Sequence, residues 1–352
     1  MDQRESTKVK GLAVLLLLFH HLFYSATRME ENQMVFYLLS EQVVQNAALA
    51  ARVCVWMFAF LSAFGLTRKY MELASPRQAG EIGTFLRRRW ISLMKPYWFV
   101  FVLLFLASFI LFQNPLEVYQ RNPVYIFLGF FALSDLFGTP TLCGIWWYMC
   151  FAQILLFFLP VCAELCHKFG WSTLILGYLS IQYLGEGIRS PYGGTYLGYL
   201  LVILLGVLCA QGQVFERIGQ TVGRGWRRYL AGTGAVALAI GCLCAHLATD
   251  SGGQAKVFMT VAACLLSLSV YLLAIGQTAS RILFCLGRYS GTIFLVHGFS
   301  YLHYPQLIYW SHNVPLTYLT LLAISLLLSI GIEKLQQLLR YPQWGRRRNK
   351  IA

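Results

Sequence analysis

The chain has 352 residues, of which 58% are hydrophobic and only 12% are charged, and its formal net charge is +14. A soluble domain carries about 25% charged residues, so this composition excludes an ordinary soluble globular protein. The basic residues lie between apolar segments, which points to membrane topology and away from nucleic-acid binding.

The apolar segments, taken in chain order, predict an all-α, polytopic bundle of about ten transmembrane helices. Most approach or exceed the roughly 18 residues that a helix needs to cross a bilayer. We interpret the first as a retained span and not a signal peptide, because it is long and lacks a small-residue cleavage site. The ten segments are 11–27, 46–66, 96–113, 145–164, 173–185, 194–211, 230–248, 257–275, 286–303 and 314–334.

An eleventh apolar segment, 125–137, is short, and the basic residues decide whether it spans. If it does not, 23 of the 28 Lys and Arg side chains lie on the side of the N-terminus; the other five are Arg28, Arg52, Arg121, Arg189 and Lys256. Because basic loops stay in the cytoplasm, we predict that both termini are cytoplasmic. Segment 125–137 then lies in the interface or re-enters. Residues 1–340 form one integral membrane domain, and 341–352 form a basic cytoplasmic tail.

The first apolar segment carries the most unusual polar residues. Lys10 and His21 are eleven residues apart, which is three helical turns plus about 20°, so they share a face about 16 Å apart along the axis. His20 points about 100° away from His21. If Lys10 marks the cytoplasmic edge, His21 lies near the middle of the membrane. A histidine in a span is either an interhelical hydrogen-bonding residue or part of a site, and the shared face with Lys10 favours a site.

Three later features also carry candidate chemistry. Arg87, Arg88 and Arg89 precede the third span on the cytoplasmic side, where they either anchor topology or bind phosphate. Trp146, Trp147 and Tyr148 begin a span at the outer face, as an aromatic belt or as a stacking surface. His297 lies nine residues, about 13 Å, beyond Arg288. It therefore reaches the depth of His21, where it either shares a cavity with it or bonds a neighbouring helix. The ten cysteines show no metal-ligand spacing, so we expect packing roles and no metal.

Five stretches in order resemble membrane acyltransferase family 3, from about residue 8 to residue 335. KGLAVLLLLFHHLF resembles the opening helix of the family, with its basic residue on Lys10 and its histidine on His21. The later stretches are FAFLSAFGLTRKY, FLRRRWISLMKPYW, IWWYMCFAQILLFFLP and GRYSGTIFLVHGF.

The resemblance implies a multi-pass enzyme of the bacterial cytoplasmic membrane. Such enzymes move an acyl group, usually acetyl from cytosolic acyl-CoA, to a hydroxyl of a cell-surface or lipid-linked carbohydrate. His21 is then the general base, with burial favouring the neutral imidazole that a base needs. Lys10 acts near the donor phosphates or orients the site, and Arg87, Arg88 and Arg89 bind the CoA phosphates. His297, Trp146, Trp147 and Tyr148 contact the acceptor. No permanently bound cofactor is expected.

Two other classes of function compete with this interpretation. A transporter or flippase for a small solute or a glycan intermediate can use the same helices, but it often shows inverted repeats or broken helices, and we find neither in the sequence. A structural or scaffolding role leaves the histidines of the spans unexplained.

Overall fold

The apolar segments form helices because a chain in lipid must satisfy its backbone hydrogen bonds internally. The computed structural model describes residues 1–73, 79–184, 189–190, 194–249, 252–273 and 276–341. The first half contains α1 (Gln3–Phe23), α2 (Ala26–Glu31), α3 (Glu41–Ala51), α4 (Val53–Met71), α5 (Ala79–Leu111), α6 (Pro115–Val118), α7 (Pro123–Phe130), α8 (Ser134–Phe137), η1 (Gly144–Trp146) and α9 (Trp147–Phe169).

The second half begins with η2 (Gly170–Ser172), α10 (Thr173–Leu184) and a two-stranded antiparallel hairpin of β1 (Arg189–Ser190) and β2 (Gly194–Thr195). It continues with η3 (Tyr196–Tyr199), α11 (Leu200–Gln211), α12 (Val214–Val222), α13 (Trp226–Leu247), α14 (Gly253–Leu272), α15 (Gln277–His303), α16 (Pro305–Ile308) and α17 (Val314–Leu338). Of the predicted basic tail, 341–352, only Tyr341 is among the described residues.

The prediction of a polytopic helix bundle is confirmed. Within the described ranges, eight helices are long and apolar enough to cross a membrane, and the bent pair of α11 and α12 raises the number to nine. The difference from the predicted ten lies at α10, which follows α9 in one continuous helical stretch, Gly144–Leu184. With 12 residues, α10 is about 18 Å long, shorter than the roughly 30 Å hydrocarbon core.

Segment 125–137 forms the short helices α7 and α8, so the prediction that it does not span is confirmed. The chain turns after α5 and runs back along it. Tyr119 packs against Phe105, Phe130 stacks on Trp98 and Phe131 stacks on Trp90. The segment packs against α5 and α9, and whether it lies in the interface or re-enters stays a prediction.

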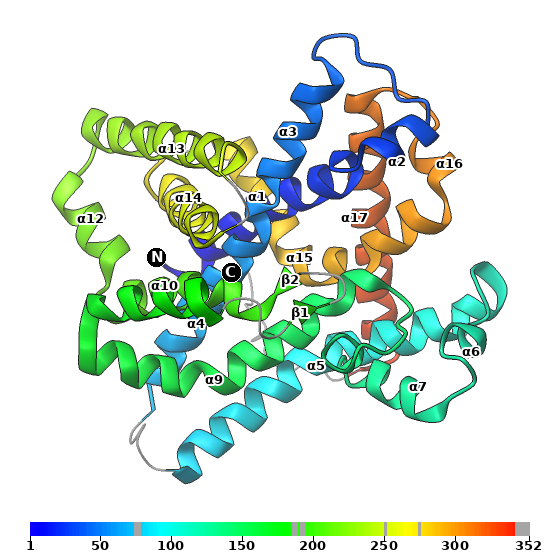
Figure 1. The fold of residues 1–352 in the computed structure, drawn as a ribbon, viewed down its shortest axis with the longest axis horizontal. Coiled ribbons are helices and arrows are strands. Elements are labelled where there is room, and N and C mark those ends of the chain that lie inside the picture. Colours follow the sequence, from blue (N-terminus) through cyan, green and yellow to red (C-terminus); the bar gives the residue numbers. More distant parts are fainter. Residues whose placement is uncertain (74–78, 185–188, 191–193, 250–251, 274–275, 342–352) are drawn as a thin grey trace.

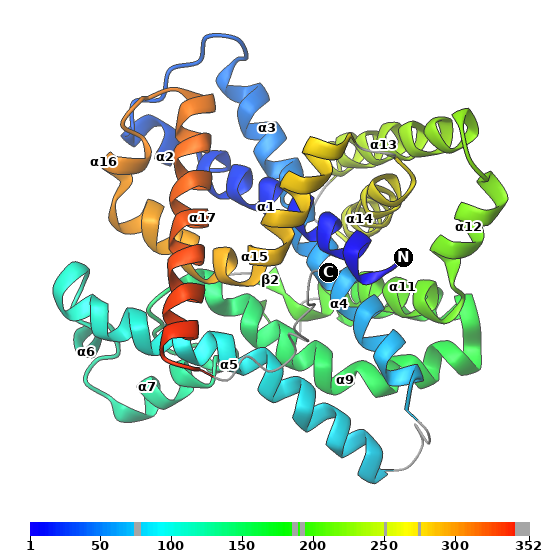
Figure 2. The ribbon, with the colours of Figure 1, turned by 180° about the vertical axis from the view of Figure 1, so that it is seen from behind.

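Helix α1 lies at the centre of the bundle in both views (Figures 1 and 2), in contact with α3, α4, α14, α15 and α17. Two of its faces enter separate hydrophobic clusters. Val9, Ala13 and Leu17 recur every four residues and pack with α4, α9, α11 and α14. Val14, Leu18 and Leu22 recur in the same way and pack with α5, α15 and α17. Burial on both faces fixes the rotation of α1 about its axis.

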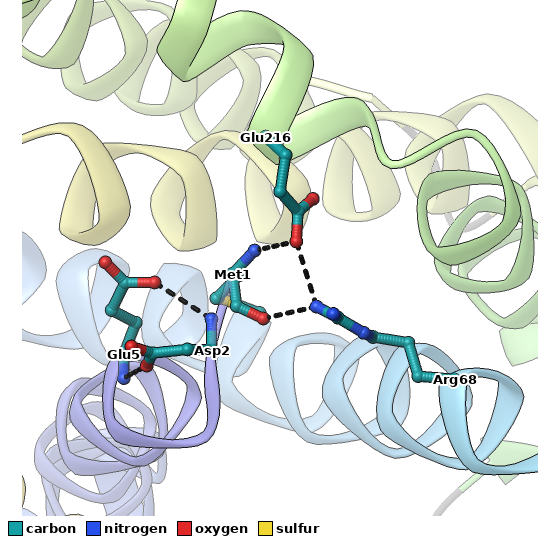
Figure 3. Close-up of polar contacts among 5 residues, drawn as sticks. All are labelled: Met1, Asp2, Glu5, Arg68 and Glu216. Carbon is teal, nitrogen blue, oxygen red and sulfur yellow. Dashed lines mark hydrogen bonds and ion pairs between the residues drawn. The ribbon is translucent and has the colours of Figure 1, made fainter. Parts of the chain in front are cut away.

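The start of α1 is held by polar contacts that Figure 3 shows. Asp2 and Glu5 form a reciprocal capping box that satisfies free backbone N–H groups. The amino group of Met1 pairs with the Glu216 carboxylate of α12 at 2.5 Å, and Arg68 of α4 reaches the same carboxylate at 2.9 Å. The start of α1, the end of α4 and α12 therefore lie at one end of the bundle, as the charge pattern predicts for three segments on one side.

Helices α1 and α15 approach each other very closely. A Cβ atom on Gly287 would overlap the carbonyl oxygen of Thr7, and one on Gly11 would overlap that of Leu283. Only glycine lets two backbones come so near, which is the usual device for tight helix contacts in membranes. The backbone contact thus fixes both the spacing and the register of the two helices.

We predict that Gly287→Ala lowers the free energy of unfolding by about 1–3 kcal/mol, the usual penalty for overpacking. The measurement is the thermal midpoint of the purified protein in detergent. The matched control is Gly291→Ala, one turn further along α15, where a Cβ meets nothing within 4 Å. Because alanine favours helix over glycine, the control should equal or exceed the wild type. Equal midpoints for the two variants would contradict the tight contact.

Candidate active site

The structure brings together the two histidines that the sequence predicts to share a site. His21 lies in the last turn of α1, His297 lies in α15, and their ring centroids are 5.1 Å apart. Each stands ten residues beyond the glycine at the helix contact, Gly11 or Gly287. The two helices run in the same direction from that contact. Because each rises about 15 Å over ten residues, the two imidazoles lie at the same height along the helices.

The hydrogen bonds of His297 fix its tautomer. Its Nδ1 lies 3.0 Å from the carbonyl oxygens of both Ile293 and Phe294, one turn earlier in α15. A carbonyl oxygen only accepts, so Nδ1 carries the proton and Nε2 carries a lone pair. The side chain is fully buried, and Nε2 has no hydrogen-bond partner among the described residues. His297 is therefore held by its backbone with one unused acceptor.

His21 contacts a tyrosine from the same helix as His297. The hydroxyl of Tyr301, one turn after His297, lies 3.3 Å from Nδ1 of His21, and the two rings stack at 5.9 Å. His20 instead turns to α3, where its Nδ1 donates to the carbonyl oxygen of Ala48 at 2.8 Å. The two adjacent histidines face different helices, as their separation of about 100° predicts. Only His21 faces His297 and Tyr301 together.

Arg28 of α2 closes the end of α1. Its Nη1 donates to the carbonyl oxygen of His21 at 2.6 Å, and its guanidinium lies over the rings of Tyr301 and Tyr24, at 5.0 and 5.4 Å. A cation is stabilised at a helix C-terminus, where the last carbonyls are unpaired. Tyr309 adds a hydrogen bond to the carbonyl of Leu22 at 3.0 Å. The backbone that carries His21 is thus held on two sides.

The three aromatic residues predicted at the outer face divide into two groups. Trp146 is only 3% exposed, and its Nε1 donates to the carbonyl oxygen of Leu295 at 3.0 Å. Its ring packs against Tyr97 and Phe299, so it joins α5 to α15 beside His297 and belongs to the core instead of an aromatic belt. Trp147 and Tyr148 are partly buried. A stacking role against a substrate stays a prediction for all three residues.

The predicted basic residues lie away from the histidines. Lys10 lies about 16 Å along α1 from His21, and its ammonium group forms no ion pair with the described residues. Arg87 and Arg88 are exposed on α5, while the Arg89 guanidinium lies over the Phe85 ring at 5.6 Å. Arg89 is eight residues, about 12 Å, from the part of α5 that contacts Trp146.

Sequence reasoning missed Arg28 and Tyr301 as parts of this site. Tyr301 has a signal in the sequence, because a residue four positions after His297 shares its helical face. Arg28 has none, because its position depends on the turn between α1 and α2. A groove of about 760 Å³ between the ends of α4 and α9 and the start of α5 is lined by Tyr70, Ile82 and Lys168, among others, and by neither site histidine.

The fold and this site define a polytopic helical membrane protein with two opposed imidazoles between its first and its penultimate long helix. Residues 9–334 match a family model described as an acyltransferase domain. The chain therefore belongs to membrane acyltransferase family 3 and is a membrane acyltransferase. No curated protein and no solved structure matches the chain.

We predict that Tyr301→Phe lowers kcat of acyl transfer about two- to tenfold, the effect of losing one hydrogen bond, and leaves KM unchanged. The loss follows because the ring still packs but His21 can rotate. The matched control is Tyr304→Phe, whose hydroxyl donates to the carbonyl of Leu111 and touches neither histidine. Equal kcat values for the two variants would show that Tyr301 does not position His21.

Proposed function

We propose that the protein is an O-acyltransferase that moves an acetyl or other short acyl group from cytosolic acyl-CoA to a hydroxyl of a cell-surface or lipid-linked carbohydrate. We place it in the bacterial cytoplasmic membrane, where a multi-pass enzyme meets the cytosolic donor on one side and the glycan on the other. The observation that carries the proposal is the pairing of His21 with His297, whose Nε2 is an unused buried acceptor.

The proposed reaction uses His21 as general base. Its Nδ1–H donates to the Tyr301 hydroxyl, which leaves Nε2 free to take the proton of the acceptor hydroxyl. The acceptor oxygen bonds to the thioester carbon, the C–S bond breaks, and the proton passes from His21 to the departing CoA thiolate. The lone pair on Nε2 of His297 accepts a hydrogen bond from the sugar and so orients the attacking oxygen. Trp147 and Tyr148 offer the stacking surface.

The donor would lie along α5. Arg87 and Arg88 are exposed, and guanidinium groups bind phosphate bidentately, so they are suited to the CoA phosphates, with Arg89 beside them. From there α5 leads to Tyr97, and Tyr97 contacts Trp146, which bonds α15 next to His297. Lys10 supports the donor side from α1, about 16 Å along the helix from the base.

We predict that His21→Ala lowers the rate of acyl transfer by about 10²–10⁴, the contribution of a positioned base. The assay follows labelled acetyl-CoA and the release of free CoA by purified protein. His20→Ala should keep most activity because His20 bonds α3, and the exposed His312→Ala is the surface control.

Two results would contradict the assignment. Normal turnover in His21→Ala with a dead His20→Ala would remove His21 from the role of base. A protein that never turns over acyl-CoA but moves a solute across vesicles would be a transporter.

A further inference from the structure

A second cation stands near the end of α1, at the break between α3 and α4. Arg52 ends α3 and begins α4, and its side chain is exposed. Tyr199 of η3 lies beside its guanidinium. Arg52 follows Ala48 by one helical turn, and the carbonyl oxygen of Ala48 accepts from His20, while Arg28 donates to the carbonyl oxygen of His21. The two guanidinium groups therefore lie near the end of α1 that carries both histidines, Arg28 on α2 and Arg52 at the helix break.

No carboxylate of the described residues lies within ion-pair distance of Arg28 or Arg52. The charge of Arg28 has a structural explanation, because it caps the carbonyl end of α1. The charge of Arg52 has no such structural explanation, because its side chain makes no capping hydrogen bond. An ionisable residue inside a membrane-spanning segment is costly and generally serves a function.

The proposed reaction leaves this excess of positive charge in place. When His21 takes the proton of the acceptor, the balancing negative charge appears on the attacking oxygen and then on the departing thiolate, so Arg28 and Arg52 still have no anion of their own. A neutral acceptor offers nothing to offset them. An acceptor that carries its own negative charge stabilises the imidazolium and pairs with the exposed guanidinium.

The position of Arg52 favours the acceptor over the donor. Arg68, which contacts the start of α1, lies sixteen residues away from Arg52, about 24 Å along α4. The Cβ of a helical residue points toward the helix N-terminus, so Arg52 leans away from that end of the bundle. Tyr199, which lies beside Arg52, stacks on Trp147 at 5.9 Å. A guanidinium beside two stacked aromatic rings suits a sugar that carries an anionic group.

We infer that the acceptor is an acidic carbohydrate, whose carboxylate or phosphate group pairs with Arg52 while its hydroxyl faces His21. The inference rests on the proposed function and adds a substrate class to it. The anion fixes the sugar in the site and lowers the barrier to proton transfer. Carboxylate sugars and phosphorylated glycans share this chemistry, and the experiment separates them.

The test measures acetyl transfer in nanodiscs to matched oligosaccharides that are neutral, carboxylated or phosphorylated. The wild type should use one acidic class with a kcat/KM at least tenfold above the neutral one, and its KM for that class should rise with salt. Arg52→Gln should lower this preference about ten- to a hundredfold, the range for a charged hydrogen bond. The preference of Arg52→Lys for the acidic acceptor should lie between those of the wild type and Arg52→Gln, because lysine keeps the charge but cannot bind an anion bidentately. The matched control is Arg121→Gln, an exposed arginine next to α7.

Several outcomes would overturn the inference. Equal use of neutral and acidic saccharides by the wild type would do so while leaving the proposed function intact. An equal loss with all acceptors in Arg52→Gln would assign Arg52 to the acyl-transfer step itself. A preference that follows the anionic lipid content of the nanodisc would assign it to phospholipid headgroups. Failure to acylate any saccharide, with acyl-CoA left intact, would contradict the proposed function and the inference together.

Discussion

The backbone contact between α1 and α15 at Gly11 and Gly287 determines where the chemistry of this protein lies. Each helix continues ten residues from the contact to a histidine. The register of the two helices at the glycines therefore sets the level at which His21 and His297 meet. Burial of two faces of α1 in separate hydrophobic clusters fixes its rotation and turns His21 toward α15 and His20 toward α3. Packing far from the site therefore fixes the positions of the two histidines, because a closely packed interior transmits displacements over long distances.

The electrostatics of the site follow from where the charges stand. His297 is held by two carbonyl oxygens in the tautomer that leaves Nε2 free, and His21 meets the Tyr301 hydroxyl. Arg28 and Arg52 lie near the same end of α1, and no carboxylate among the described residues is within ion-pair distance of either guanidinium. The site contains imidazole bases and guanidinium cations but, among the residues described, no carboxylate of its own. A bound substrate can supply the negative charge that these cations lack. The preorganised groups then stabilise charge that develops in the reaction.

Much of this arrangement was predictable from periodicity and charge. Span lengths predict the helix bundle, the basic loops predict that 125–137 does not span, and helical angles separate His21 from His20. The limits have physical causes. Trp146 at the start of an apolar helix has the pattern of an interfacial residue, but the fold-back of 112–131 along α5 buries it against α15. The 12 residues of α10 follow α9 in one helical stretch, so eight or nine candidate spans are found where the apolar segments predict ten. The positions of Arg28 and Arg52 depend on a turn and a helix break, which no periodicity encodes.

The most direct test of the central claim, that acyl transfer occurs between His21 and His297, is a cryo-electron microscopy structure with a non-transferable acyl-CoA analogue, whose thioester sulfur is replaced by a methylene group. The account predicts that the acyl carbonyl carbon lies between the two imidazoles, close enough for an attacking oxygen about 3–3.5 Å from it to reach Nε2 of His21. The analogue bound in the groove between α4, α5 and α9, with its acyl carbon remote from both histidines, would contradict it.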